Sequence, residues 1–368
     1  MSENRPDGST SGSQDLGVMQ GEGFYNRHSK PQHSVVELGL SLLPQAVEAV
    51  PLPVPGEVFS VADYGVAGGR NSVEPVRMII DTVRRRAGQD LPVSVVHTDI
   101  PANDFNPLFG LLSSPEGYLA GLSNVFAYVE GRSFYERLFP DAQVHVGWSA
   151  SAVNWLSSVP APIPDHIWSN RATGRVREAF AGQSGRDWRQ FLDHRRHELK
   201  PGGRLVVLGN ASDDYGSTGA EGLLDLANGA LQEMVQEKIL GPDEYGRMVI
   251  PTYNRTLEEY EAPFSEAGIA DDLELESASV AALEDPFWAE YQQNGDLGAY
   301  ADSYADFFQA AGGSSLLAAL DEGRSDIEGQ EILGAFHEKL KSKVAADPAA
   351  AVCNWLIACL LISRKPAS

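Results

Sequence analysis

A glycine-rich turn that follows an acidic residue is the first feature of this sequence that could do chemistry. The stretch Val58–Ser72 reads V-F-S-V-A-D-Y-G-V-A-G-G-R-N-S, so an apolar run leads through Asp63 into a turn with Gly65, Gly68 and Gly69. Glycine lets the backbone approach a bound molecule closely. The G-x-G-x-x-G dinucleotide fingerprint is absent, because Asp63 stands where its first glycine would be. A carboxylate there favours an amine-bearing or cationic ligand over a pyrophosphate, and an ordinary tight turn is the alternative.

The segments around this turn must position it, and they indicate the fold class. Val58–Ala62 is predicted to be a strand and Ser72–Arg86 an amphipathic helix. Strand, glycine turn and helix form the first unit of a doubly wound α/β sheet, where ligands bind at the carboxyl ends of the strands. Further strands are predicted at Pro92–His97, Gln143–Trp148, Gly203–Leu208, Leu273–Ser277 and Asn354–Ile362. Helices alternate with the first four strands, so a mostly parallel sheet is expected.

Composition narrows the class of ligand. The net charge of −23 argues against nucleic acid, which requires a basic surface. The basic clusters Arg84–Arg86 and His194–His197 are expected to be solvated helix faces. There is no apolar run of the roughly 18 residues that a membrane helix needs, and no secretory signal is evident, so a cytoplasmic protein is expected. Cys353 and Cys359 are predicted to be buried thiols rather than a disulfide. A small-molecule substrate is the simplest expectation.

The domain organisation follows from the same patterns. Residues 1–18 are predicted to be a disordered tail and 19–368 a single domain. An amphipathic helix is expected over His33–Leu43, which Pro44 should end or kink. Long helical segments at about 211–265 and 283–345 exceed what sheet crossovers need, so they are predicted to form an inserted helical cap that encloses a substrate pocket.

Several segments occur in an order that resembles one enzyme family. They are G-E-G-F-Y-N-R-H-S-K-P-Q (Gly21–Gln32), A-D-Y-G-V-A-G-G-R-N-S (Ala62–Ser72), H-T-D-I-P-A-N-D-F-N (His97–Asn106), S-F-Y-E-R-L-F-P (Ser133–Pro140), H-V-G-W-S-A-S-A-V-N-W-L-S-S-V-P (His145–Pro160) and L-K-P-G-G-R-L-V-V (Leu199–Val207). Together they resemble the SABATH family of S-adenosylmethionine-dependent carboxyl methyltransferases, densely over Met19–Leu208 and more loosely through the cap. The resemblance implies a Rossmann-like, mostly parallel seven-stranded sheet. It also implies S-adenosylmethionine as methyl donor, S-adenosylhomocysteine as product, and an aromatic, fatty or terpenoid acid as methyl acceptor.

The resemblance also assigns residues to the cofactor. They are Tyr25, Ser29, Asp63, Gly65, Asn71, Asp99, Ile100, Ser133 and Phe134. Asp99 would accept both ribose hydroxyls, which suits a carboxylate with two acceptor oxygens. Asp63 would receive the methionine ammonium directly or through water; the alternative is a turn residue that holds its own backbone.

The adenine end and the lid are assigned in the same way. Ile100 would lie against adenine, Phe134 would stack on it and Ser133 would hydrogen-bond it, while an ordinary core position is the alternative for Phe134. Tyr25 and Ser29 would belong to a lid that excludes water. Separately, the alternative for Asn71 is a helix N-cap that pairs with Glu74.

The acid would be held by four further residues. In the family, the counterparts of Gln32 and Trp155 donate neutral N–H groups to the substrate carboxylate and orient it. Ser151 stands where a Tyr is common, so the pocket should be wider, and Asn154 adds polarity. A carboxylate is already ionised at neutral pH, so no catalytic acid or base is assigned. His145 and His166 are interpreted as structural.

Three further points stay open at this stage. The run Gly246–Val249 lacks the Asp-x-Phe-Asn pattern of metal-binding relatives, so magnesium is doubtful and no metal ligand is assigned. A homodimer is an open alternative to a monomer. N-methylation of a purine-like heterocycle and cofactor binding without catalysis are the alternative functions, although the presence of Gln32 and Trp155 argues against both.

Overall fold

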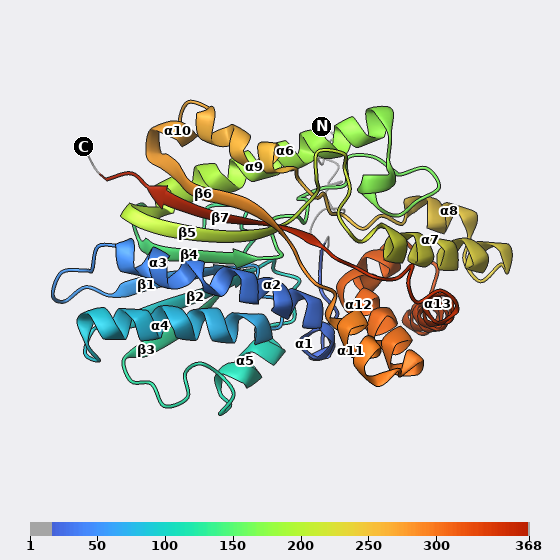
Figure 1. Ribbon diagram of the computed structural model, residues 1–368, viewed down its shortest axis with the longest axis horizontal. Coiled ribbons are helices and arrows are strands. Elements are labelled where there is room, and N and C mark those ends of the chain that lie inside the picture. Colours follow the sequence, from blue (N-terminus) through green and yellow to red (C-terminus); the bar gives the residue numbers. More distant parts are fainter. Residues whose placement is uncertain (1–16, 367–368) are drawn as a thin grey trace, which may run out of the picture.

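One mixed sheet organises the computed structural model, which describes residues 17–366 (Figure 1). The predicted disorder of 1–18 therefore falls mostly outside the described residues. The strands are β1 Phe59–Tyr64, β2 Val93–Asp99, β3 Val125–Gly131, β4 Val144–Ala150, β5 Leu199–Ala211, β6 Leu273–Ala282 and β7 Leu356–Arg364. Their order is β3-β2-β1-β4-β5-β7-β6, with β1 to β5 parallel and β7 antiparallel to both neighbours. The predicted α/β fold with a mostly parallel seven-stranded sheet is confirmed.

Helices cover both faces of the sheet and one end of it. Their bounds are α1 Phe24–His28, α2 Lys30–Leu40, α3 Leu42–Ala49, α4 Val73–Ala87, α5 Asn106–Leu112, α6 Gly174–Glu198, α7 Glu221–Gln236, α8 Pro242–Arg247, α9 Leu257–Glu261, α10 Ile269–Asp272, α11 Pro286–Asn294, α12 Leu297–Leu317 and α13 Asp326–Ala346. Helices α2 to α4 pack on one face, and α6, α9 and α10 lie on the other (Figure 1). None of the helices described here is long and apolar enough to cross a membrane.

Strand β7 shows how the sequence builds this sandwich. Ile357, Cys359 and Leu361 pack with α2, α3 and α4, whereas Ala358 and Leu360 face the cluster around α6. Successive side chains of a strand point to opposite faces, so a strand covered by helices on both sides must be apolar at every position. The run L-I-A-C-L-L-I meets this requirement, and the two cysteines are free and buried, as predicted.

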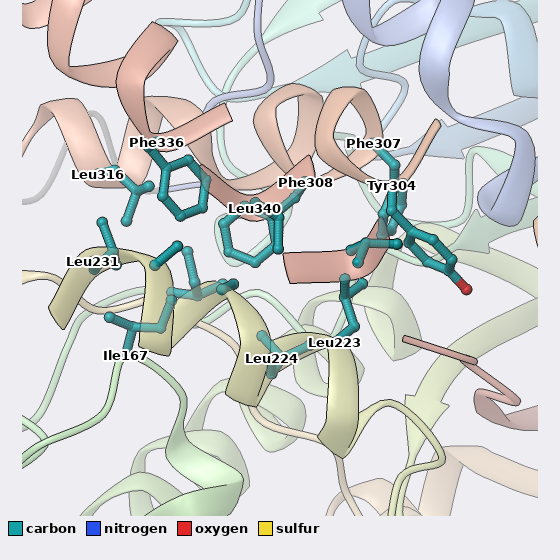
Figure 2. Packing of buried hydrophobic residues seen from close by; sticks show 14 of the residues in the cluster. Ile167, Leu223, Leu224, Leu231, Tyr304, Phe307, Phe308, Leu316, Phe336 and Leu340 are labelled. Atoms are coloured by element: carbon teal, nitrogen blue, oxygen red, sulfur yellow. The ribbon is translucent and has the colours of Figure 1, made fainter. Parts of the chain in front are cut away.

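Helices α7, α8 and α11 to α13 gather at one end of the molecule (Figure 1). Leu231 from α7, Phe308 from α12, and Phe336 and Leu340 from α13 share one apolar cluster there (Figure 2). Each buried side chain of this size contributes about 1.5–3 kcal/mol through the hydrophobic effect. These helices lie in the segments expected to form a cap, although α9 at the end of the first segment packs against β6 instead.

Three local expectations were wrong. Pro44 does not end the first helix: α2 ends at Leu40 and Pro44 lies in the first turn of α3, where a missing N–H is tolerated. Arg84 is not solvated, because its guanidinium donates to backbone carbonyls, that of Ser123 among them. Arg195 is fully buried beside Glu198. Backbone carbonyls replace solvent around Arg84, and backbone carbonyls with the Glu198 carboxylate replace it around Arg195.

Candidate active site

Two cavities lie at the carboxyl ends of the central strands. The larger cavity, of about 400 Å³, is lined by Gly17, Met19, Tyr25, Gly65, Ala67, Asp99, Ile100, Pro101, Asn103, Ser133, Phe134, Tyr135, Glu136, Ala150, Ser151, Ala152, Trp155, Leu156, Ser157 and Gln190. The smaller cavity, of about 110 Å³, is lined by Pro31, Gln32, Val35, Ser151, Asn154, Trp155, Trp168, Asn210, Leu223, Leu224, Ile250, Thr252, Asn254, Phe307, Phe308, Ala311, Gly312 and Trp355. Ser151 and Trp155 line both, so the two cavities adjoin at these residues.

Asp99 is an acidic residue on the wall of the larger cavity. It ends β2, where Oδ2 accepts the Ala67 N–H at 2.7 Å and Oδ1 accepts the Ile100 N–H at 2.8 Å. Burial raises its pKa to about 6, although these two backbone donors work in the opposite direction. Each carboxylate oxygen can accept a second hydrogen bond, so Asp99 retains acceptor capacity toward the cavity.

The glycine turn after β1 allows the close packing at this edge. Gly65 has a φ of +86°, and a Cβ there would lie 2.4 Å from the Cβ of Ala152. A Cβ on Gly68 would lie 2.3 Å from the Asn26 side-chain oxygen. A larger residue at Gly65 would push away the loop after β4, and one at Gly68 would displace the Asn26 side chain that bonds the turn.

Asp63 is held by other side chains, so the alternative of a turn residue that holds its own backbone is wrong, while its predicted contact with the methionine ammonium stays a prediction. Its Oδ2 lies 2.7 Å from His97 Nδ1, and His97 Nε2 lies 2.8 Å from the Tyr118 hydroxyl. Asp63, His97 and Tyr118 are all buried. The carboxylate is therefore fixed by a chain of side chains rather than by its own backbone. Asp63 still lines a third cavity of about 20 Å³, together with Tyr25, Gln32 and Asn71.

His97 and Tyr118 were missed by the sequence reasoning. His97 lies inside a predicted strand, two residues before Asp99, and reads as a core position. Tyr118 follows α5, in a loop without regular structure. The one available signal was a histidine at a strand position that faces the core, because a buried histidine requires hydrogen-bond partners.

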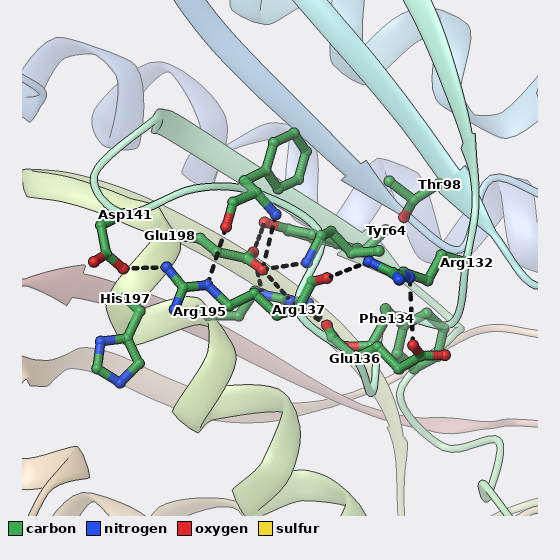
Figure 3. A network of polar contacts seen from close by, with 12 residues as sticks. Tyr64, Thr98, Arg132, Phe134, Glu136, Arg137, Asp141, Arg195, His197 and Glu198 are labelled. Carbon is green, nitrogen blue, oxygen red and sulfur yellow. Dashed lines mark hydrogen bonds and ion pairs between the residues drawn. The ribbon is translucent and has the colours of Figure 1, made fainter.

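The loop that carries Ser133 and Phe134 is supported from beneath by a buried ion pair (Figure 3). Arg195 donates to the carbonyl oxygens of Phe134 at 2.9 Å and Glu136 at 3.0 Å, and it pairs with Glu198 at 2.9 Å. Glu198 in turn accepts the Leu138 N–H at 2.6 Å. The charged pair is buried in α6 because its hydrogen bonds satisfy backbone N–H and C=O groups of an irregular loop, which form no hydrogen bonds within the sheet.

Phe134 serves the core and the cavity at once. Its ring lies edge-on to Phe191 with centroids 5.9 Å apart, and it also lines the larger cavity. Ser133 accepts the Tyr135 N–H at 3.2 Å and lines the same wall, as does Ile100. The three residues predicted for adenine therefore share one cavity.

The N-terminal segment closes over the turn through specific polar contacts. Asn26 donates to the Gly68 carbonyl at 2.7 Å, and the Glu22 N–H donates to Asp104 at 3.0 Å. Burial, with the Asp99 carboxylate as a second cause, raises the pKa of Tyr25, which lines the larger cavity. This polar segment is ordered because its side chains bond the glycine turn and the Asp104 loop.

Ser29 and Asn71 meet each other rather than opening directly onto the larger cavity. Asn71 donates to the Ser29 hydroxyl at 3.3 Å, and Ser29 is buried. The N-cap that was the alternative for Asn71 is not formed: α4 begins at Val73 with Ser72 at the N-cap position and no side-chain cap. The intervening turn of 3₁₀-helix, Arg70–Ser72, shifts the start of α4 beyond the reach of Asn71.

Trp155 is held rigidly at the junction of the two cavities. Its carbonyl accepts the Tyr135 hydroxyl at 2.6 Å, and buried Arg255 donates to the Val153 carbonyl at 2.7 Å. Gln32, from α2, lines the smaller cavity, and its buried side-chain oxygen has no hydrogen-bond partner within residues 17–366. The structure thus brings the predicted pair from distant parts of the chain to one pocket.

Ser151 and Asn154 complete the wall between β4 and this pocket. Ser151 has a φ of +53°, in the left-handed region, and it borders both cavities rather than the smaller one alone. The Asn154 side-chain oxygen and the Ser151 hydroxyl are buried without a partner in the described part of the chain. Whether Ser151 widens the pocket stays a prediction.

The remaining polar residues do not suggest acid–base or metal chemistry here. His145 accepts the Ser60 N–H at 3.0 Å, and burial lowers its pKa to about 4. His166 pairs with Asp225 at 3.3 Å, away from both cavities. No group of three or more His, Cys, Asp or Glu side chains that could hold a metal occurs among the described residues.

The larger cavity has the groups that S-adenosylmethionine requires. A carboxylate with spare acceptor positions suits the ribose hydroxyls, and apolar Ile100 and Phe134 suit the adenine ring. Asp63, fixed by His97, supplies a negative charge on the side where the glycine turn lies. The residues present therefore fit the cofactor.

Comparisons with known proteins agree with this geometry. The model of the family described as SAM dependent carboxyl methyltransferase matches residues 14–362. Methyltransferase LUC1 of Fusarium sp is 30% identical over 256 residues, which is 67% of this chain and 66% of that protein. Gibberellic acid methyltransferase 2 of Arabidopsis thaliana is 29% identical over 273 residues, covering 66% of this chain and 69% of that protein. The aligned region thus spans about two thirds of these relatives.

A solved structure extends the agreement to the whole fold. Loganic acid methyltransferase with SAH has a TM-score of 0.77 at 23% identity, and the match covers 94% of this chain and 98% of that one. The resemblance drawn from the sequence motifs is confirmed: this chain belongs to the family of S-adenosylmethionine-dependent carboxyl methyltransferases.

Proposed function

We propose that the protein transfers the methyl group of S-adenosylmethionine to a carboxylate oxygen of a small-molecule acid. The products are a methyl ester and S-adenosylhomocysteine. The observation that supports this most strongly is the junction at Trp155, where a cavity suited to the cofactor adjoins an uncharged pocket. The names of the relatives, which include acids such as gibberellic acid and loganic acid, point to the same class of substrate.

The chain contributes binding and orientation rather than proton transfer. When bound, S-adenosylmethionine supplies an electrophilic methyl group on a sulfonium centre. Gln32 and Trp155 would donate neutral N–H groups to the carboxylate, which keeps its negative charge available for attack because no cation neutralises it. Phe307 and Phe308, which line the same pocket, would exclude water from the bound acid. Holding the two reactants in line is the main source of rate.

The test is direct transfer of label from S-adenosylmethionine carrying a labelled methyl group. Purified protein is incubated with a panel of aromatic, fatty and terpenoid acids, and the extracted product is identified by mass spectrometry. A labelled methyl ester that disappears on treatment with alkali supports the proposal. A xanthine in the panel tests purine N-methylation, because an N-methyl product survives alkali. Transfer to the xanthine alone, or to no acid of any class, would reject the proposed reaction.

A further inference from the structure

The smaller cavity has two chemically different walls. Side chains from α2, α7 and α12 form an apolar wall that includes Val35, Leu223 and Phe307. The ends of β4 and β5 and the chain near 252 contribute a second part of the lining, the polar wall, which contains Ile250 and Trp155 and five neutral polar side chains. They are Ser151, Asn154, Asn210, Thr252 and Asn254. A ligand in this cavity therefore has both hydrocarbon and neutral hydrogen-bonding groups around it.

Two of the five polar side chains of this wall have buried atoms that the described part of the protein leaves without a partner. Asn154 is 5% exposed, yet its amide oxygen has no partner among residues 17–366, and neither has the Ser151 hydroxyl. Buried polar groups without partners are uncommon, because each has lost its water without a replacement. Two such groups on one cavity wall indicate that the ligand supplies the partners. An amide and a hydroxyl can each donate or accept, so the ligand group can be a hydroxyl or a carbonyl.

Charge sets a second condition on the ligand. No Asp, Glu, Lys, Arg or His side chain appears among the described residues that line the smaller cavity. A second carboxylate or an ammonium group on the acid would lie in this cavity without a counter-ion, and burying an unpaired charge is strongly unfavourable. The reacting carboxylate is the one anionic group that Gln32 and Trp155 can serve.

We infer that the acid has an uncharged body with an apolar face and at least one hydroxyl or carbonyl group, which Asn154 and Ser151 bind. This inference rests on the proposed function, because it takes the smaller cavity as the place of the acid. It excludes plain fatty acids, unsubstituted aromatic acids and dicarboxylic acids as preferred substrates. A cavity of about 150 Å³ binds benzene, and this cavity of about 110 Å³ is smaller but adjoins the larger one at Ser151 and Trp155, so acids with a single ring are the largest probes chosen.

The experiment compares benzoate, the three hydroxybenzoates and phthalate. Binding of each acid to the protein loaded with S-adenosylhomocysteine is measured by calorimetry, and methyl transfer is measured separately. We expect the best hydroxybenzoate to bind at least about tenfold more tightly than benzoate, which corresponds to about 1.4 kcal/mol. Phthalate should bind at least about tenfold more weakly than benzoate. Equal affinities for benzoate and every hydroxybenzoate, or tight binding of phthalate, would overturn the inference.

Variants locate the preference on the proposed residues. Asn154→Leu keeps the side-chain size and removes the amide, so the ratio of hydroxybenzoate to benzoate affinity should fall to below about threefold. Asn170→Leu is the matched control, because Asn170 also has buried, unpaired amide atoms but lines neither cavity. The control should keep the wild-type ratio. Ser151→Ala serves if Asn154→Leu does not fold. A preference that survives in the folded polar-wall variants contradicts the assignment.

The two proposals fail in different ways. Selective binding without any methyl transfer would reject the proposed reaction and keep the polar wall as the determinant of ligand class. Methyl transfer to benzoate and hydroxybenzoates at equal efficiency would keep the reaction and reject the role of Asn154 and Ser151.

Discussion

The larger and the smaller cavity differ in how their polar groups are paired. In and around the larger cavity, Asp99 accepts two backbone N–H groups, Asp63 is bonded by His97, and Ser133 accepts the Tyr135 N–H. On the wall of the smaller cavity, Asn154 and Ser151 have buried polar atoms without partners in the structure as described. The polar groups of the larger cavity are fixed by hydrogen bonds within the protein, whereas Asn154 and Ser151 in the smaller cavity have atoms free to bond a ligand.

This difference matches the two ligands that the family requires. A cofactor with one fixed structure is best bound by a site that is already ordered, because little freedom is lost on binding. Part of the lining of the smaller cavity comes from α7 and α12, which pack with α13 through side chains (Figure 2). A few substitutions on such walls can change the ligand without disturbing the sheet.

The largest effect is expected from a substitution of Asp99, on the wall of the larger cavity. Asp99→Ala removes the acceptor for two ribose hydroxyls and leaves two backbone N–H groups without their partner. Bonds to charged acceptors contribute about 1.5–3 kcal/mol each and are not additive, so cofactor affinity should fall by about 2–4 kcal/mol. Calorimetry with S-adenosylmethionine measures it. An unchanged dissociation constant in a folded variant would show that the ribose binds elsewhere.

The next effect comes from the junction of the two cavities. Trp155→Phe keeps most of the apolar area and removes the indole N–H, so kcat/KM for the acid should fall about ten- to a hundredfold, the equivalent of one bond to an anion. Cofactor affinity should change less than about threefold. Trp288→Phe on α11, remote from both cavities, is the matched control. Equal losses in acid turnover and cofactor affinity would mean that Trp155 has no separate role in orienting the acid.

A smaller effect should appear in the dependence of cofactor affinity on pH. Burial raises the pKa of Asp99 to about 6, so the carboxylate is ionised above this pH and becomes protonated below it. A protonated carboxyl loses acceptor capacity, so affinity should be nearly constant above about pH 7, fall about twofold at about pH 6 and fall by up to about tenfold by about pH 5. Asp99→Asn does not titrate and should flatten the profile. The same decline in that variant would assign the pH dependence to another group.

The smallest effect is expected at the far end of the chain that fixes Asp63. Tyr118→Phe removes the hydroxyl that contacts His97 Nε2 at 2.8 Å and leaves the His97–Asp63 contact in place. Loss of one hydrogen bond of about 1 kcal/mol should raise KM for the cofactor about fivefold and leave kcat nearly unchanged. Steady-state kinetics with varied cofactor separates the two. A lower kcat with unchanged KM would contradict a role confined to positioning Asp63.

Many residues around the larger cavity could be predicted from the sequence because they lie at the ends of sheet strands. Asp63 and Asp99 come at the ends of apolar strands, and parallel strands bring such ends to one edge. The contacts that fix Asp63 and the loop with Ser133 and Phe134 could not be predicted, because no sequence pattern relates Tyr118 or Arg195 to the site. Strand β3 was missed because Phe126 and Tyr128, its largest apolar side chains, point to solvent at the sheet edge.

The smaller cavity was less predictable for a physical reason. Its helical wall depends on how α7 and α12 pack together, and helix periodicity indicates an apolar face without showing which residues border a cavity. Gln32, Ser151, Asn154 and Trp155 were placed from motifs, and all four line it. Asn210 and Thr252 were not anticipated, because Asn210 lies in a strand and Thr252 in an irregular segment.

The central claim is that the acid lies in the smaller cavity with its carboxylate held at the junction. A crystal structure with S-adenosylhomocysteine and an acid that the protein methylates tests this most directly. We expect the carboxylate oxygens within about 2.7–3.2 Å of the Gln32 amide nitrogen and the Trp155 indole nitrogen, with the rest of the acid between Asn154 and Phe307. A carboxylate that points away from Trp155, or an acid bound outside the smaller cavity, would contradict the account.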